Sequence, residues 1–206
     1  MEIDKDKIKN ILVIRRNSIG DMICAIPLLK TLRNEFQNAH ITVLTEVYSA
    51  GIIEGASFID DVIVIKKRRG LYGNKYIGYY RLFRHNERRF DLAIGVKAGF
   101  SSLLAFITLI SGAKIRMGCI PERWHPLQFC YNFSVKGCRR WRSLHVVDGL
   151  LEFIKVIGIN TPIRDISIEV IPDSVERVRN FFNGNKIPLD TNIAVFNISN
   201  NKPENR

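Results

Sequence analysis

An acidic residue stands in a short polar turn directly after an apolar, β-prone run near the amino terminus. Arg15 and Arg16 end the run, and Ser18, Gly20 and Asp21 follow. A carboxylate placed there, beside arginine side chains, can accept a proton from an incoming hydroxyl group. Asp21 or Ser18 can instead cap the following helix, a structural role worth about 1 kcal/mol. The spacing alone leaves both interpretations open.

Other common catalytic and metal-binding patterns are missing from the sequence. The turn holds neither G-x-G-x-x-G nor G-x-x-x-x-G-K-[ST], so we do not expect hydride transfer or nucleoside triphosphate hydrolysis. The single D-x-D, at residues 4–6, lies in a charged amino-terminal segment, and we expect no metal. Cys24, Cys119, Cys130 and Cys138 form no C-x-x-C pair, so reduced thiols are expected.

Positive charge is concentrated in two parts of the chain. The net charge is +11; residues 66–89 carry nine cations against one acidic residue, and residues 114–142 carry seven against one. Such clusters fit an acidic partner, whether nucleic acid, anionic lipid headgroups or a phosphorylated small substrate. A charge cluster can equally be a solvated face, and the sequence does not separate these interpretations.

Aromatic side chains are mixed with the cations of the first cluster. They are Tyr72, Tyr76, Tyr79, Tyr80 and Phe83. This mixture suits a membrane interface, an anionic glycolipid or a single-stranded nucleic acid. The helical spacing also fits packing onto a sheet. His145 and Asp148 likewise either face one pocket or serve as a helix cap.

Hydrophobic periodicity predicts a doubly wound α/β domain with a mainly parallel sheet. Strands are expected at 11–14, 41–44, 62–65, 92–96, 114–118, 166–170 and 193–197. Helices are expected at 22–36, with an irregular first turn at Pro27, and at 101–111, 144–157 (ending at Gly158) and 172–182.

Length and composition agree with a globular protein. The 206 residues are 46% hydrophobic and 25% charged, which excludes disordered, collagen-like and integral-membrane classes. The apolar stretch 92–110 contains Lys97 and glycines, so a strand, a turn and a helix explain it better than a membrane span. The charged start of the chain argues against a signal peptide.

Several segments resemble, in order, the amino-terminal half of the ADP-heptose:lipopolysaccharide heptosyltransferases, glycosyltransferase family 9. The most specific is the S-x-G-D stretch in residues 11–21 (ILVIRRNSIGD). Supporting segments lie at 27–33, 39–44, 58–63, 90–94, 111–118, 145–148, 158–159 and 193–197. The resemblance spans nearly the whole chain.

The resemblance implies a Rossmann-like amino-terminal lobe of a GT-B fold, with residues 1–206 forming one acceptor-side lobe and no donor-binding lobe. It implies inverting transfer of a sugar, heptose by analogy, from a nucleotide sugar such as ADP-heptose to an anionic lipopolysaccharide core acceptor. No cofactor is expected. Asp21 matches the family's proposed general base. A chain without the donor lobe is expected to be inactive unless a separate polypeptide supplies it.

The remaining site residues are expected to bind substrate. They are Arg15, Arg16, Ser18, Gly20, Lys97, Arg139, Arg140, Lys202 and Arg206. The resemblance places the protein in the cytoplasm, with peripheral contact to the inner membrane, and no nucleic acid is expected as a partner. The alternative is a non-catalytic basic module or remnant that binds an anionic glycolipid or nucleic acid.

Overall fold

The computed structural model describes residues 3–16, 18–65, 74–84, 89–97, 99–136, 143–188 and 190–194. The chain divides into two compact units, Met1–Glu169 and Val170–Arg206. The described strands all lie in the first unit, so this unit holds the sheet that positions the candidate site.

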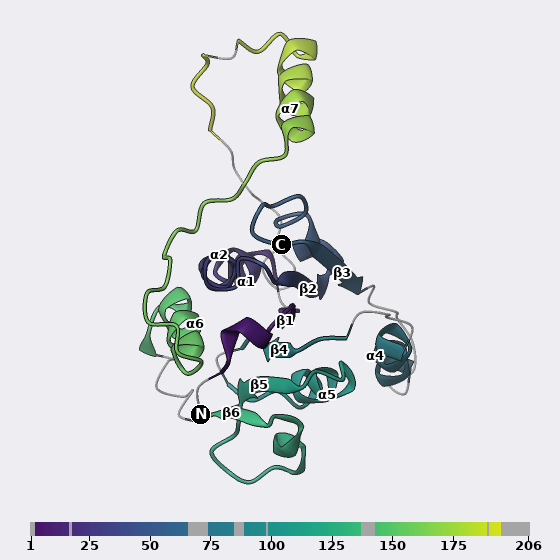
Figure 1. The fold of residues 1–206 in the computed structure, drawn as a ribbon. Helices are drawn as coiled ribbons and strands as arrows, with labels where there is room; N and C mark the ends of the chain where they lie inside the picture. The colour runs from purple at the N-terminus through teal and green to yellow at the C-terminus, as the bar shows by residue number, and fades with distance from the viewer. Residues whose placement is uncertain are drawn as a thin grey trace. The chain divides into compact units, whose positions relative to one another are not determined.

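The described part of the first unit contains one six-stranded sheet in the order β3-β2-β1-β4-β5-β6, with every neighbouring pair parallel (Figure 1). The strands are β1 (Asn10–Ile14), β2 (His40–Glu46), β3 (Asp61–Ile65), β4 (Leu92–Gly95), β5 (Ile115–Cys119) and β6 (Phe133–Val135). The first five confirm predicted strands. The short edge strand β6 was not predicted.

Helices connect and follow these strands. They are α1 (Ile19–Ile23), α2 (Ile26–Glu35), α3 (Val47–Ala50), α4 (Asn74–Arg84), α5 (Ser102–Ile110), α6 (Val146–Lys155) and α7 (Pro172–Gly184), with single 3₁₀ turns η1 (Lys5–Lys7) and η2 (Pro126–Cys130). The expected helix 22–36 is split into α1 and α2, with Pro27 in the first turn of α2. Gly158 adopts a φ of 82° just beyond α6, which confirms it as a helix terminator. No described helix is long and apolar enough to cross a membrane.

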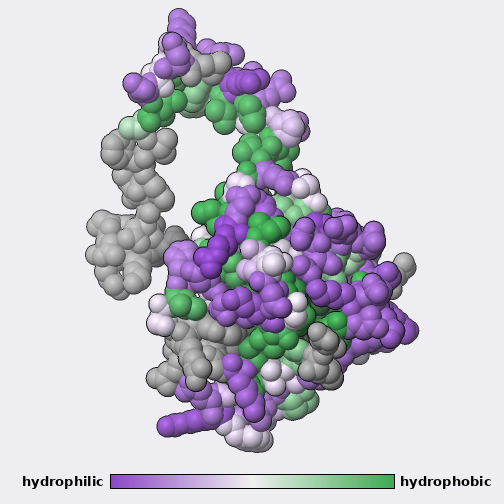
Figure 2. Space-filling model, turned by 60° about the vertical axis from the view of Figure 1, so that its left-hand side comes forward, coloured by the Kyte–Doolittle hydropathy of each residue, from purple (hydrophilic) through white to green (hydrophobic). Residues whose placement is uncertain are grey.

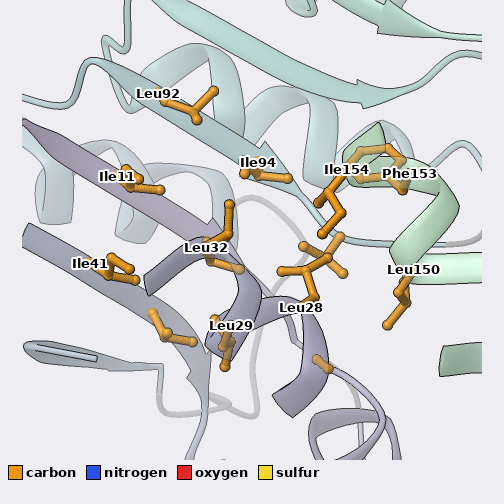
Figure 3. Packing of buried hydrophobic residues seen from close by; sticks show 14 of the residues in the cluster. Ile11, Leu28, Leu29, Leu32, Ile41, Leu92, Ile94, Leu150, Phe153 and Ile154 are labelled. Atoms are coloured by element: carbon orange, nitrogen blue, oxygen red, sulfur yellow. The ribbon is translucent and has the colours of Figure 1, made fainter. Parts of the chain in front are cut away.

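Helices cover both faces of the sheet, so β1 is buried on both sides. Ile11 and Val13 point into a cluster with α2 and α6, part of which is drawn in Figure 3. Leu12 and Ile14 point into a second cluster with α4 and α5. A strand buried on both sides needs apolar residues at every position, so the predicted doubly wound α/β fold is confirmed.

One aromatic ring packs unusually close to the sheet. Tyr131 lies over Gly118 of β5, where an added Cβ would come within 2.1 Å of the ring. It also approaches Gly95 of β4 and hydrogen-bonds Thr108 of α5. Burial raises the pKa of the Tyr131 hydroxyl, and the Thr108 bond opposes this shift. Glycine at 118 is therefore a packing requirement.

The strand predicted at 166–170 is wrong: these residues lie outside the sheet. Residues 165–169, themselves part of the first unit, are instead held by hydrogen bonds to Lys30 and Ser57. Lys30 Nζ donates to Asp165 Oδ2 at 2.6 Å and to the Ser167 carbonyl at 2.9 Å, and Ser57 N donates to Glu169 Oε2 at 2.6 Å. A β-branched stretch forms a strand only where a neighbouring strand offers a ladder. Of the strand expected at 193–197, residues 193–194 are not in a strand and the rest lie outside the described residues.

The cysteines differ from expectation at one position. Cys119 is disulfide-bonded, so the prediction of reduced thiols is wrong there. Cys24 and Cys130 are free. Burial raises the pKa of the Cys130 thiol, more strongly than the Arg116 cation lowers it. Within the described residues, no group of three or more His, Cys, Asp or Glu side chains could hold a metal ion.

The described part of the second unit, taken by itself, consists mainly of α7. No residue of this helix is buried, and Val175, Val178 and Phe181 recur at helical spacing with exposed side chains. The surface of this unit accordingly shows hydrophobic patches beside hydrophilic ones (Figure 2). The helix confirms the prediction at 172–182.

Candidate functional site

The candidate site lies between β1 and β4, where the order of the strands across the sheet changes direction. From β1 the sheet continues on one side through β2 and β3 and on the other through β4, β5 and β6. In open parallel sheets, ligands gather at the carboxyl ends of the strands beside such a reversal. Arg15 and Arg16 follow β1 and Lys97 follows β4, so the fold brings these predicted residues to one edge.

Arg15 joins the ends of β1 and β4 to helix α1. Its Nη2 donates to Asp21 Oδ1 at 2.8 Å, its Nε to the Asp21 carbonyl at 3.1 Å, and its Nη1 to the Val96 carbonyl at 3.0 Å. The side chain is only 3% exposed. Burial lowers the pKa of the Arg15 guanidinium, while the Asp21 charge acts in the opposite direction. Because all three donated bonds are internal, the geometry favours a positioning role for Arg15.

Asp21 is held by two side chains and remains open to solvent. Its Oδ1 accepts from Arg15, and its Oδ2 accepts from Ser18 Oγ at 3.0 Å. The side chain is 33% exposed. An ionised carboxylate offers about four acceptor positions, so both oxygens can accept further hydrogen bonds. The arrangement can take a proton from a hydroxyl group that approaches from solvent.

The helix-cap interpretation of this turn does not describe the observed contacts. Ser18 is the N-cap residue of α1, but its side chain makes no capping bond and donates to Asp21 instead. Gly20 is exposed, and a Cβ built there would meet nothing within 4 Å. Packing therefore does not require glycine at position 20.

Arg16 belongs to a second contact group that sequence reasoning missed. Its Nη2 lies 3.1 Å from Glu46 Oε1 at the end of β2, and its guanidinium lies 5.4 Å from the ring centroid of Tyr79. Burial raises the pKa of Tyr79, although the Arg16 charge acts in the opposite direction. The sequence did contain one indication of this ion pair, because Glu46 ends β2 and β2 is the neighbour of β1.

The aromatic stretch divides according to burial. Tyr79 and Phe83 are buried against the sheet, which confirms the packing interpretation for these two residues. Tyr80 is half exposed. Tyr72 lies outside the described residues, as does the side chain of Tyr76.

The other predicted site residues fall into two groups. The Lys97 side chain is exposed at the edge of the sheet that Arg15 occupies. Arg139, Arg140, Lys202 and Arg206 lie outside the described residues, so their predicted roles stay predictions.

His145 and Asp148 do not form a paired site. His145 Nδ1 accepts from Val147 N at 3.3 Å and caps α6, and Asp148 instead forms an ion pair with Arg164 at 2.7 Å. The helix-cap interpretation is therefore confirmed for His145.

No family model and no curated protein matches this chain. Among solved structures, a family 9 glycosyl transferase from Veillonella parvula matches with a TM-score of 0.75 and 23% identity, over 99% of this chain and 57% of its own. The E. coli ADP-heptose lps heptosyltransferase II matches with a TM-score of 0.63 and 20% identity, over 84% of this chain and 50% of its own. The E. coli heptosyltransferase WaaC with ADP matches with a TM-score of 0.58 and 19% identity, over 74% of this chain and 49% of its own. The chain thus spans about half the length of these transferases and shares their fold over that half, in agreement with the resemblance found in the sequence.

Proposed function

We propose that this chain is the acceptor-binding lobe of a GT-B glycosyltransferase. The observation that carries the proposal is the Asp21 carboxylate, held by the buried Arg15 at the reversal point of the sheet and one-third exposed. The fold shared with known glycosyltransferases supports this choice over other chemistries available to a carboxylate at a sheet edge.

In this proposal Asp21 acts as the general base. It removes the proton from an acceptor hydroxyl while the hydroxyl oxygen forms a bond to the anomeric carbon of the donor sugar. The bond from that carbon to the nucleoside diphosphate breaks, and the diphosphate leaves with the bonding electrons. Attack from the face opposite the leaving group inverts the anomeric configuration.

The proposed acceptor is a lipid-linked anionic sugar of the lipopolysaccharide core, and the proposed donor is ADP-heptose. Two of the structural neighbours are heptosyltransferases, one of them solved with ADP, which supports these substrates. Exposed Lys97 would attract the acceptor's negative charge, and the predicted roles of Arg139 and Arg140 are the same. The reaction would take place at the cytoplasmic face of the inner membrane.

Donor binding is proposed to need a second lobe in addition to these 206 residues. The coverage of about half of each neighbour supports this requirement. Lys202 and Arg206 would meet the donor diphosphate from the acceptor side.

The test is a mass-spectrometric transfer assay with ADP-heptose and heptose-deficient lipopolysaccharide core. It is run with and without co-expressed candidate donor-lobe polypeptides. Transfer that appears only in a complemented mixture supports the proposal. Binding that ignores sugar identity and weakens steeply with salt, without transfer in any mixture, would favour the non-catalytic basic module instead.

A further inference from the structure

The connection between β5 and β6 carries two of the most exposed aromatic side chains in the described part of the first unit. Trp124 is 78% exposed and Phe129 is 64% exposed. Tryptophan is normally well buried, so an outward indole and a second exposed ring five residues further along the same connection indicate an interaction surface.

The local backbone explains why both rings point outward. In the 3₁₀ turn η2, residues three apart lie on one side. Leu127 and Cys130 take the inner side and join a cluster with α5, which leaves Phe129 outside.

Trp124 is directed outward by its neighbour. His125 has extended backbone, its ring packs 4.7 Å from the Phe100 ring, and its Nδ1 accepts from Leu127 N at 3.1 Å. Successive side chains in extended backbone alternate in direction, so Trp124 points away from the packed His125. The ring is therefore presented by a fixed turn.

Exposed cations lie near the start of this connection. Arg123 is exposed beside Trp124. Lys136 is exposed directly after β6, where Val135 O accepts from Ile120 N at the start of the same connection. Glu122 is the acidic residue of this segment, and it already takes part in an interaction. Aromatic rings with cations beside them fit an interface that is apolar inside and negative at its surface.

We propose that the β5–β6 connection docks this protein onto an anionic lipid surface. Trp124 and Phe129 enter the headgroup region, and Arg123 and Lys136 contact the lipid phosphates. Because the sheet is parallel, this connection leaves β5 at the same edge that carries Asp21. Docking would hold the candidate site close to a lipid-linked substrate.

The first experiment measures co-sedimentation with vesicles of equimolar phosphatidylglycerol and phosphatidylethanolamine. We expect Phe129→Ser to weaken partitioning about tenfold and Arg123→Gln about fivefold. Phe181→Ser is the matched control, because Phe181 is 61% exposed but lies on α7, and it should leave partitioning unchanged. Uncharged phosphatidylcholine vesicles should bind much less protein.

The second experiment follows the indole directly. The chain has two tryptophans, so Trp141→Phe leaves Trp124 as the single indole. Its emission should shift to shorter wavelength on anionic vesicles and be quenched by brominated lipid. Unchanged Trp124 emission would overturn the proposal, as would equal partitioning of the W124S/F129S double variant or an equal loss in Phe181→Ser. Neither experiment uses sugar transfer, so a failure here is distinct from failure of the proposed function.

Discussion

Replacing Arg15 by methionine removes the cation that holds Asp21 while keeping a side chain of similar length. The change deletes three hydrogen bonds, to Asp21 Oδ1, to the Asp21 carbonyl and to the Val96 carbonyl. Arg15 is 3% exposed, so water has little access to the carbonyl groups left behind. Breaking a buried ion pair costs about 3–5 kcal/mol, and the partial exposure of Asp21 moves the expected loss to about 3 kcal/mol.

The assay is urea-induced unfolding followed by far-ultraviolet circular dichroism, with the free energy of unfolding extrapolated to water. Arg16→Met is the matched control, since Arg16 is 20% exposed and pairs with Glu46 at 3.1 Å. Glu46 is only 12% exposed, but Arg16 donates one hydrogen bond to it where Arg15 donates three, so we expect this control to lose about 2 kcal/mol. The reasoning is refuted if Arg15→Met costs no more than Arg16→Met.

A double-mutant cycle separates the Arg15–Asp21 pair from packing. Asp21→Asn keeps the side-chain shape but removes the charge. Both substitutions break the same ion pair, so the double variant should lose less free energy of unfolding than the sum of the two single losses. We expect a coupling free energy of about 1–2 kcal/mol between the two changes. Simple additivity would show that the two side chains do not act as a pair.

Two further predictions concern packing and pH. Gly118→Ala should destabilise the protein by about 3 kcal/mol in thermal unfolding, because the added Cβ collides with the Tyr131 ring. Gly78→Ala is the control and should not destabilise the protein, because its Cβ meets open space in α4. Equal effects of the two substitutions would refute the argument. Burial raises the pKa of Asp91, but the Lys114 ammonium and two backbone N–H groups outweigh it, and the folded pKa lies below its ordinary value. Asp91→Asn should therefore lower the free energy of unfolding by about 2 kcal/mol at pH 7. This difference from wild type should become smaller below about pH 4, as the wild-type carboxylate becomes protonated. A difference that stays constant with pH in urea unfolding would contradict the prediction.

The sheet was predictable because burial on both faces leaves continuous apolar runs, as in residues 11–14. The effects of Pro27 and Gly158 were predictable for a different, local reason. Proline restricts the backbone conformation at the first turn of a helix, and the end of a helix requires a conformation that glycine adopts easily. The short strand β6 has too few residues for a pattern to emerge. The segment 166–170 has a strand-like composition, but no property of those residues reveals that a neighbouring strand is lacking.

The candidate site was predictable in part. Asp21 stood out through its position in the turn after a buried strand, and the structure holds its carboxylate between Arg15 and Ser18 with one-third of the side chain exposed. Sequence reasoning proposed Arg15 as a substrate-binding cation because it could not show which of two adjacent arginines turns inward. The contact of Arg15 with Val96 joins residues far apart in the chain, and so does that of Arg16 with Glu46. Such pairings depend on the strand order, which the local pattern does not specify.

The most direct test of the account is the rate of sugar transfer by Asp21→Asn in an assay mixture that supports transfer by the wild-type chain. The account predicts a kcat lower by about a hundred- to ten-thousandfold, with acceptor binding and the folded circular dichroism spectrum retained. Transfer by Asp21→Asn at the wild-type rate would contradict the assignment of Asp21 as the base.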